Sequence, residues 1–542
     1  MKPSVLAASL LLAGSAGAAP FTWDNATVYF LLTDRFNNAS TANDHAYGRG
    51  SAAPLRGFMG GDLKGVTAKI RAGYFKDLGV DALWITPPVE QIHASTDEGT
   101  GESYGFHGYW AKDFTAVDAA LGTEADLREL VATAHQHGLR VLLDVVMNQI
   151  GPVTAQDPVW PADWVRTAPR CDFKTAATTI ECTLVANLPD LRTESATEVA
   201  LPPPLVEKWK QEGRYDSEVA SLDAFFKRTG YPRTPRYHLV KWHTDYVRKF
   251  GFDGFRADTV KHVEPDAWRA LKKEAALAYE DWKRANPKEK LGDQPFYMTA
   301  EAYGYAPQMG LDFNLGDKSF NYYDAGFDSM INFAMKGDAA KSYEQLFSEY
   351  SAILNGPLKG HSILNYISSH DDGGPFDQLR TKPFEAGTKL LLAPGAAQIY
   401  YGDETARLLK IEGAQGDATL RSFMNWDELA KNVQRNGYRI GEVRQHFALL
   451  GRFRHDHPAI GAGVHAKLAD QPYTFKRTLD RDGLRDQVVI ALDAPKGAKI
   501  SVGGVFADGT RVTDGYTGQH AVVRKGQVSF ARSGRVTLIA AD

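Results

Sequence analysis

The sequence predicts an α/β fold: a (β/α)8 barrel with a small domain inserted after the third strand and an antiparallel β-domain at the C-terminus. Two observations predict the barrel. Three segments, 75–86, 135–146 and 248–259, each end a helix at a glycine and continue into an apolar strand, as in parallel sheets covered by helices. Five further strand candidates raise the number to eight, which favours a closed barrel over an open sheet. They are 28–33, 296–301, 327–333, 363–369 and 397–401.

The N-terminal segment 1–19 predicts a secretory signal peptide. It has one lysine, an apolar run from Val5 to Leu12 and the small residues Ala16-Gly17-Ala18, which form a cleavage site of the A-x-A type. The run is too short to span a membrane, and no later stretch is long and apolar enough. We therefore expect an exported chain, periplasmic or secreted, whose barrel begins at residue 20.

The helix predicted before strand segment 135–146 illustrates the signals that indicate the helices of the barrel. Thr123 is an N-cap with Asp126 three residues later, and Gly138 closes the helix. Between them, apolar residues recur at the spacing of one helix face: Leu127, Leu130, Val131 and Ala134. The first part of the barrel is expected to run to residue 148.

Residues 149–236 are expected to form the inserted domain, because almost ninety residues without strong periodicity are too many for a plain connection. The segment holds the only two cysteines, Cys171 and Cys182. An exported chain meets an oxidising compartment, so we expect them to form a disulfide. The barrel resumes over 237–460. Residues 461–542 read as short alternating strands with Gly and Asp turns, which predicts the C-terminal β-domain.

Composition excludes some partners. The net charge of −4 gives no reason to expect nucleic acid or an anionic membrane. Aromatic residues at 11% suit a cleft that stacks on flat ligands such as sugars, although a large core alone accounts for the same composition. We expect a monomer.

Three acids close predicted strands at the barrel end where such folds carry out their chemistry. Asp258 follows the fourth strand, Glu301 the fifth and Asp371 the seventh. Arg256 points to the same side as Asp258 and should keep it ionised, whereas the apolar strand before Glu301 should keep that acid protonated. One Arg–Asp pair is more often a structural contact. Three acids at three strand ends instead suit cleavage of a glycosidic bond by a nucleophile and a general acid.

Over about residues 28–460 the chain resembles the α-amylases of glycoside hydrolase family 13, and it is most similar to the exported bacterial members. DVVMNQ (144–149), GFRADTVKH (254–262), the strand ending at Glu301 and ISSHDD (367–372) resemble the family's four conserved regions. LPDL (188–191) resembles an additional region in the inserted domain. The resemblance implies retaining, endo-acting hydrolysis of internal α-1,4-glucosidic bonds in starch, glycogen or maltooligosaccharides. Asp258 would be the nucleophile, Glu301 the acid/base and Asp371 the transition-state stabiliser.

The resemblance also implies substrate contacts. Tyr109 would stack on the sugar at the cleavage subsite, with His107 nearby and His370 bonding the same sugar. Lys261 and His262 would contact the leaving group, although Lys261 could instead be a solvated surface lysine. The full set of expected contacts is His107, Tyr109, Trp110, Gln149, Arg256, Lys261, His262 and His370.

The resemblance also implies calcium as the cofactor, an ion that oxygen ligands suit. Asn148, Asp190 and the main-chain carbonyl of His262 match the family's calcium site between barrel and inserted domain. A loop near the N-terminus resembles a second calcium loop of bacterial amylases and cyclodextrin glucanotransferases, although a turn rich in Asn and Asp is more often only a turn. Its candidate ligands are Asn38, Ser40, Asn43, Asp44, Gly60 and Asp62.

Two positions depart from the family pattern. Gln149 stands where the first conserved region has a histidine; an amide can donate and accept but cannot become a cation. Ser369 stands where chloride-activated amylases have an asparagine ligand, so the resemblance implies no chloride dependence.

Two other functions compete with the leading one. A maltooligosaccharide-forming amylase or a transglycosylase of the same family would share all these motifs. A non-catalytic glycan-binding protein would be favoured if one acid were missing, but all three are present and only Gln149 supports that hypothesis.

Overall fold

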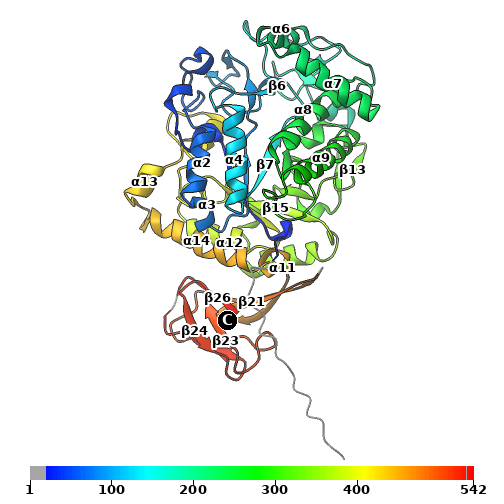
Figure 1. Cartoon of the computed structure of the whole chain (residues 1–542). Coiled ribbons are helices and arrows are strands. Elements are labelled where there is room, and N and C mark those ends of the chain that lie inside the picture. The colour runs from blue at the N-terminus through cyan, green and yellow to red at the C-terminus, as the bar shows by residue number, and fades with distance from the viewer. Residues whose placement is uncertain (1–19, 482, 533) are drawn as a thin grey trace, which may run out of the picture.

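The computed structural model describes residues 20–481, 483–532 and 534–542, so the predicted signal peptide, residues 1–19, lies outside the described residues. Eight parallel strands close into a barrel in the order β1-β16-β15-β14-β11-β10-β7-β2 (Figure 1). Each overlaps a strand expected from the sequence, which confirms the fold class. The strands are β1 (Thr27–Leu31), β2 (Ala82–Ile85), β7 (Arg140–Val145), β10 (Gly254–Ala257), β11 (Tyr297–Ala300), β14 (Ser329–Asn332), β15 (Ser362–Tyr366) and β16 (Ala396–Tyr400).

Helix α4 (Glu124–Gln136) forms as its sequence predicts. Thr123 accepts a hydrogen bond from the Asp126 backbone N–H, and the Asp126 carboxylate accepts one from the Thr123 backbone N–H, which completes a capping box. Gly138 follows with a φ of +74°, the left-handed conformation that ends many helices. The other principal helices of the barrel are α2 (Leu63–Arg71), α8 (Pro235–Phe250), α9 (Pro265–Ala285), α11 (Tyr343–Leu354), α12 (Pro383–Leu392) and α14 (Ile440–Asp456).

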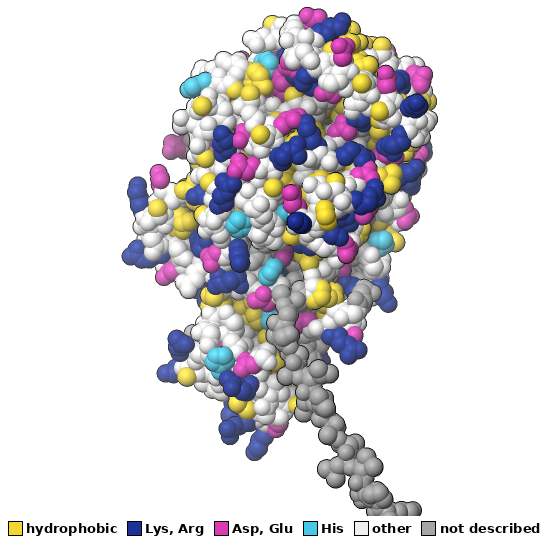
Figure 2. All heavy atoms as spheres, viewed as in Figure 1, with side chains coloured by type: hydrophobic (Ala, Val, Ile, Leu, Met, Phe, Trp, Pro, Cys, Tyr) yellow, Lys and Arg dark blue, Asp and Glu magenta, His cyan; other side chains and the backbone are white. Residues whose placement is uncertain are grey.

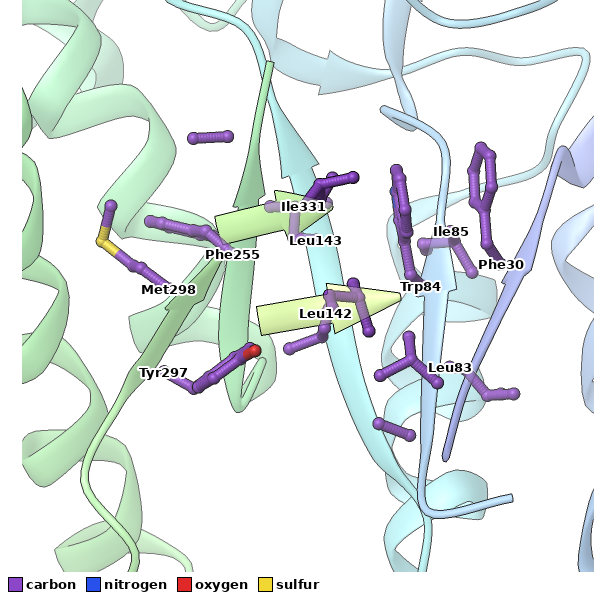
Figure 3. Close-up of a cluster of buried hydrophobic side chains, with 14 of the residues drawn as sticks. Phe30, Leu83, Trp84, Ile85, Leu142, Leu143, Phe255, Tyr297, Met298 and Ile331 are labelled. Atoms are coloured by element: carbon purple, nitrogen blue, oxygen red, sulfur yellow. The ribbon is translucent and has the colours of Figure 1, made fainter. Parts of the chain in front are cut away.

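Apolar side chains of the barrel strands pack into a large common core (Figure 3). Phe30 of β1 stacks on Trp84 of β2, with ring centroids 3.7 Å apart. The register of the barrel strands also determines which polar residues lie next to each other near their carboxyl ends. Arg256 of β10 pairs with Asp144 of β7 on one side and with Thr299 of β11 on the other. Because parallel strands end at one edge, residues just past β10 and β11 reach the same face of the barrel.

The segment between β7 and α8 contains β8 (Val165–Arg166), α5 (Ala177–Ile180), β9 (Asp190–Leu191), α6 (Pro203–Gln211) and α7 (Tyr215–Thr229). Helices α6 and α7 were not expected from the sequence. They bury only two and three large apolar side chains, respectively, so the helical pattern is weak. Lys208 and Arg214 donate hydrogen bonds to the buried carboxylate of Asp113 on β6 (Ala111–Val117), which holds this segment against that strand.

The C-terminal residues form an antiparallel sheet in the order β19-β20-β21-β26-β23-β24, as expected. Its strands are β19 (Val464–Asp470), β20 (Tyr473–Arg481), β21 (Leu484–Leu492), β23 (Arg511–Asp514), β24 (Gln519–Val522) and β26 (Val536–Ala541). Basic and acidic side chains are mixed over the visible face of the molecule, so that face has no large patch of one sign (Figure 2). Within the described ranges, no helix has the length and apolarity needed to cross a membrane.

Candidate active site

Arg256 is the centre of the candidate active site, and its side chain is 1% exposed. Its Nη1 donates to Asp258 Oδ1 at 2.7 Å and to Asp144 Oδ1 at 2.9 Å. Its Nη2 lies 3.3 Å from Glu301 Oε2. The expected contact between Arg256 and Asp258 is therefore present, but one guanidinium serves three carboxylates.

This sharing changes the expected charge state of Asp258. Burial raises the pKa of Asp258 above its ordinary value, and the Arg256 guanidinium opposes that rise. The expectation that Arg256 alone keeps Asp258 ionised is thus incomplete, because burial outweighs a cation divided among several acids. Burial also raises the pKa of Glu301 well above its ordinary value, as the apolar strand predicted.

Asp371 approaches the same group from the loop after β15. Its negative charge contributes to the raised pKa of both Asp258 and Glu301, so the three acids form one interacting set. Burial raises the pKa of Asp371 as well, and Arg421 opposes the rise most strongly. Arg421 Nε also donates to the His370 carbonyl at 2.8 Å, which ties the loop that carries Asp371. No sequence motif indicated Arg421, since it lies fifty residues further along the chain.

Asp144, the first residue of the motif DVVMNQ, is the fourth acid of the set, and no individual role was expected for it from the sequence. It accepts hydrogen bonds from Tyr109 Oη at 2.7 Å and from Trp84 Nε1 at 3.0 Å. Burial raises the pKa of Asp144 to about 7. Its contacts fix the ring of Tyr109 and the guanidinium of Arg256, so Asp144 orients its neighbours.

Tyr109, His107 and His370 form an aromatic wall. The Tyr109 ring lies 5.6 Å from the His107 ring and 5.4 Å from the His370 ring, centroid to centroid. Burial holds the pKa of both histidines well below the usual range, so both are neutral near pH 7. His107 Nδ1 accepts a hydrogen bond from the Tyr109 backbone N–H at 3.0 Å, which leaves the proton of this neutral ring on Nε2.

Three other residues that were expected to contact substrate are buried and contact other residues of the protein instead. Trp110 is 5% exposed and packs with Ile92 and Leu188. The ring of His262 is buried, with Nδ1 2.7 Å from the Thr179 carbonyl. Gln149 is 4% exposed, and its Nε2 donates to the Tyr109 carbonyl at 3.3 Å.

Two exposed aromatic residues near Lys261 were missed by the sequence analysis. Phe173 is 51% and Tyr303 52% exposed. Lys261 Nζ lies 5.7 Å and 5.4 Å from the centroids of their rings and donates to the Tyr303 carbonyl at 3.1 Å. Tyr303 could have been found, because it follows Glu301 by two residues. Nothing in the sequence indicated a substrate contact at Phe173, except that it lies two residues after Cys171.

The residues expected to bind the first calcium ion do converge. The side-chain amide of Asn148 lies 2.9 Å from Asp190 Oδ1 and 3.2 Å from the main-chain oxygen of His262, and without a cation its NH₂ group would face these oxygens as a donor. Burial raises the pKa of Asp190 to about 9, although Arg166 lies against its other oxygen. With the amide turned so that its oxygen faces the other two, the three oxygens would fit a hard cation such as Ca²⁺.

The candidate second calcium loop fits a cation less well. Asn38 Nδ2 donates to Asp44 Oδ1 at 2.9 Å, and Gly60 packs against both side chains. The Asp62 carboxylate, however, accepts backbone hydrogen bonds from Ser40 and from Gly65, where it caps α2. Among the described residues, no cluster of three or more His, Cys, Asp and Glu side chains could hold a metal ion.

The expected disulfide is confirmed: Cys171 and Cys182 are bonded, with their Cα atoms 4.9 Å apart. The loop that it closes carries Phe173 and also Thr179, whose carbonyl receives the His262 ring. The disulfide therefore closes a loop within the inserted segment, and this loop contacts the loop after β10 through the His262–Thr179 hydrogen bond.

A (β/α)8 barrel with acids gathered around one arginine at its strand ends defines the class of a glycoside hydrolase. The family model "Alpha amylase, catalytic domain" matches residues 30–167. The chain is 36% identical to the periplasmic alpha-amylase of Escherichia coli strain K12, over 88% of this chain and 74% of that protein. It is 26% identical to the cyclomaltodextrin glucanotransferase of Geobacillus stearothermophilus, over 91% of this chain and 62% of that protein.

Solved structures agree in fold. The crystal structure of an alpha-amylase from Geobacillus thermoleovorans, complexed with acarbose, has a TM-score of 0.65 at 21% identity and covers 96% of this chain and 99% of its own. The chain belongs to the α-amylase family of glycoside hydrolases and is an enzyme of that family.

Proposed function

We propose that the chain is a retaining, endo-acting α-amylase that hydrolyses internal α-1,4-glucosidic bonds of starch, glycogen or maltooligosaccharides. The observation that carries the proposal is that Asp258 and Glu301 both lie against the Arg256 guanidinium, at 2.7 Å and 3.3 Å. Two acids held by one small cation lie close together, as a retaining mechanism requires, since an inverting pair needs room for water between them.

The hydrogen bonds assign an atom to each role. Arg256 holds Asp258 Oδ1, so Oδ2, whose partner is the Thr259 hydroxyl at 3.2 Å, is the atom to attack the anomeric carbon. Glu301 Oε2 accepts from the Thr259 backbone N–H at 2.7 Å, so Oε1 is the atom to carry the proton. Attack forms a bond from Oδ2 to the anomeric carbon while the glycosidic bond breaks, and the Glu301 proton passes to the departing oxygen. Water then gives a proton back to Glu301, and its oxygen replaces Asp258 on the sugar.

The stereochemistry of the product tests this proposal. Two successive displacements at the anomeric carbon should release the α-anomer first. Proton NMR of products in the first minutes of maltoheptaose hydrolysis should therefore show the α-anomeric signal before mutarotation. Release of the β-anomer first would contradict Asp258 as the nucleophile.

The substrate wall is proposed to consist of Tyr109, His107, His370 and Lys261. His107 offers a ring N–H from Nε2, and the exposed rings of Phe173 and Tyr303 extend the wall beside Lys261. The wall does not include Trp110, which packs with Ile92 and Leu188, or the ring of His262, which bonds the Thr179 carbonyl.

Gln149 should act through Tyr109. Gln149→Ala removes the hydrogen bond to the Tyr109 carbonyl. The transition state for maltooligosaccharide cleavage should then lose about 0.5–1.5 kcal/mol of stabilisation, and kcat/KM should fall by the corresponding factor. Gln149→His keeps a donor there and should remain active, with any change confined to the acidic limb of the pH profile. If Gln149→Ala equals the wild type on every chain length, Gln149 does not position the site.

A transglycosylase is the second candidate function. The observation that favours it is the exposed pair Phe173 and Tyr303, which could hold an acceptor sugar by stacking. Chromatography of the products from maltoheptaose separates the two functions, because transfer yields chains longer than the substrate and hydrolysis does not.

Calcium is proposed at one site, held by Asn148, Asp190 and the main-chain carbonyl of His262. A divalent cation there would keep Asp190 ionised despite its burial and would join the inserted segment to the barrel. We propose no calcium at the loop around Asn38, because N–H donors already occupy Asp62. Export to the periplasm or the medium is proposed from the N-terminal sequence, in line with the name of the E. coli relative.

Removal of calcium should destabilise the protein, because a ligand that binds only the folded state adds to its stability. Exhaustive chelation with EDTA should lower the melting temperature, and added Ca²⁺ should restore it. Asp190→Asn should have a lower melting temperature in calcium buffer and respond less to EDTA. An unchanged wild-type melting curve, with no metal found by elemental analysis, would remove calcium from the proposal.

A further inference from the structure

We propose that a cleft at the floor of the barrel is a second, non-catalytic binding site for a segment of α-glucan; its ligand class rests on the proposed function. The cleft has a volume of about 510 Å³, within the range of ligand sites. Its wall includes Tyr297, Asp328 and Ser362, at the N-terminal ends of β11, β14 and β15. The catalytic acids follow the opposite ends of the barrel strands, so the two sites lie on opposite faces.

The charged side chains of the cleft wall, Asp24, Lys272 and Asp328, are each paired with an opposite charge. Lys272 Nζ pairs with Asp328 at 2.5 Å, and Asp24 pairs with Arg481. A smaller cavity shares Asp24 and Ser362 with the cleft and is also lined by Arg481 of β20, so the surface continues toward the C-terminal sheet. Paired charges along an open cleft suit a neutral polymer.

Aromatic rings and buried polar atoms give the cleft the chemistry of a sugar site. The half-buried rings of Trp23 and His361 reach its wall, and the Tyr323 ring packs 4.4 Å from that of His361. Within the described part of the chain, Trp23 Nε1 and Ser362 Oγ are buried and have no hydrogen-bond partner. Buried polar atoms without partners are rare, so water or a ligand is expected to satisfy them. A glucose unit offers both a C–H face for rings and hydroxyls for such atoms.

Two other cavities have walls less suited to a neutral ligand. One, of about 440 Å³ between α7 and α8, also has aromatic rings and the buried Nε1 of Trp242, unpartnered among the described residues, but five charged side chains line it: Glu124, Glu218, Asp245, Arg248 and Lys249. Another, of about 510 Å³ in the inserted segment, is lined mainly by proline and apolar side chains such as Val159 and Trp160. The floor cleft is therefore the better match for a neutral ligand rich in hydroxyls.

The test uses glycogen as the probe and the full chain. Electrophoresis through gels containing glycogen measures binding, in a Glu301→Gln background that prevents digestion of the gel. His361→Ala and Gln294→Ala, two changes at the wall of the cleft, should each weaken retention by about fivefold, the loss expected for one ring contact or hydrogen bond. His520→Ala, at a side chain of the C-terminal sheet that is 61% exposed, is the matched control and should not change retention.

Rates distinguish this proposal from the proposed function. With Glu301 intact, His361→Ala and Gln294→Ala should lower kcat/KM on glycogen and leave it unchanged on a short chromogenic maltooligosaccharide. Retention equal to the control in both variants would overturn the second site. A wild-type chain that fails to cleave the short substrate would overturn the proposed function, and retention that still depends on His361 would leave the second site standing. Melting curves of both variants identify a loss that comes from unfolding.

Discussion

Glu301→Gln should retain less than about one hundredth of the wild-type kcat on starch, because general acid catalysis contributes about 10²–10⁴-fold. The amide fills the space of the carboxylic acid and can still accept from the Thr259 N–H, so the loop after β10 should keep its place. What is lost is the proton on Oε1. Initial rates of reducing-sugar release, with a circular-dichroism melt to verify folding, measure the effect.

A change of leaving group makes this prediction specific. Fluoride needs little protonation to depart, so Glu301→Gln should cleave an α-maltooligosyl fluoride much better, relative to wild type, than it cleaves starch. Glu404→Gln is the matched control: Glu404 is also fully buried and accepts from Tyr29 and Tyr74, away from the reacting acids. It should affect stability and leave kcat close to that of the wild type. Equal losses on both substrates would mean that Glu301 does not deliver a proton.

The raised pKa of Glu301 also determines where activity should fall on the alkaline side of the pH–rate profile. The acid must be protonated to act, and burial moves its pKa upward, so activity should persist above the ordinary range of a glutamic acid and fall as pH passes the raised value. Asp258 must be ionised, and its pKa is raised as well, so activity should fall on acidification earlier than for an exposed aspartate.

The barrel was predictable because its strands are buried on both faces and therefore appear as apolar runs in the sequence. The acids were predictable for the same reason, since Asp258 and Glu301 end such runs abruptly. Helices α6 and α7 were missed because their buried faces are narrow. The burial of Trp110 and of the His262 ring could not be read from the chain, because each packs against the inserted segment, whose position depends on tertiary contacts.

The electrostatics of the site were predictable only in part. The pair Arg256–Asp258 follows from strand geometry, which places residues two apart on one side. The approach of Asp144 depends on the register between β10 and β7, and that of Arg421 on a long loop after β16. Neither is encoded in local spacing. The contacts of Asp144 and Arg421 help to determine the pKa of each acid. Because these contacts could not be predicted, the effect of Arg256 on the pKa of Asp258 was overestimated.

A matched control for Asp258, the proposed nucleophile, lies on the same segment of chain. Asp253, just before β10, is buried and accepts from the Val141 N–H at 2.8 Å and the Tyr279 hydroxyl at 2.8 Å, on the far side of the barrel from the reacting acids. Asp253→Asn removes a buried carboxylate without touching the site. It should lower the melting temperature and leave kcat per folded molecule nearly unchanged.

Asp258→Asn should reduce kcat below about one hundredth of the wild-type rate on starch and on the maltooligosyl fluoride alike, because no leaving group replaces a missing nucleophile. The same reagent should identify the attacking residue. In Glu301→Gln, fluoride departs without an acid but no base remains to activate water, so a glycosyl ester should accumulate. Mass spectrometry of a peptic digest should find one maltooligosyl unit on the peptide that contains Asp258 and none in the double variant with Asp258→Asn. A label on Asp371 or Asp144 instead would move the nucleophile to that residue.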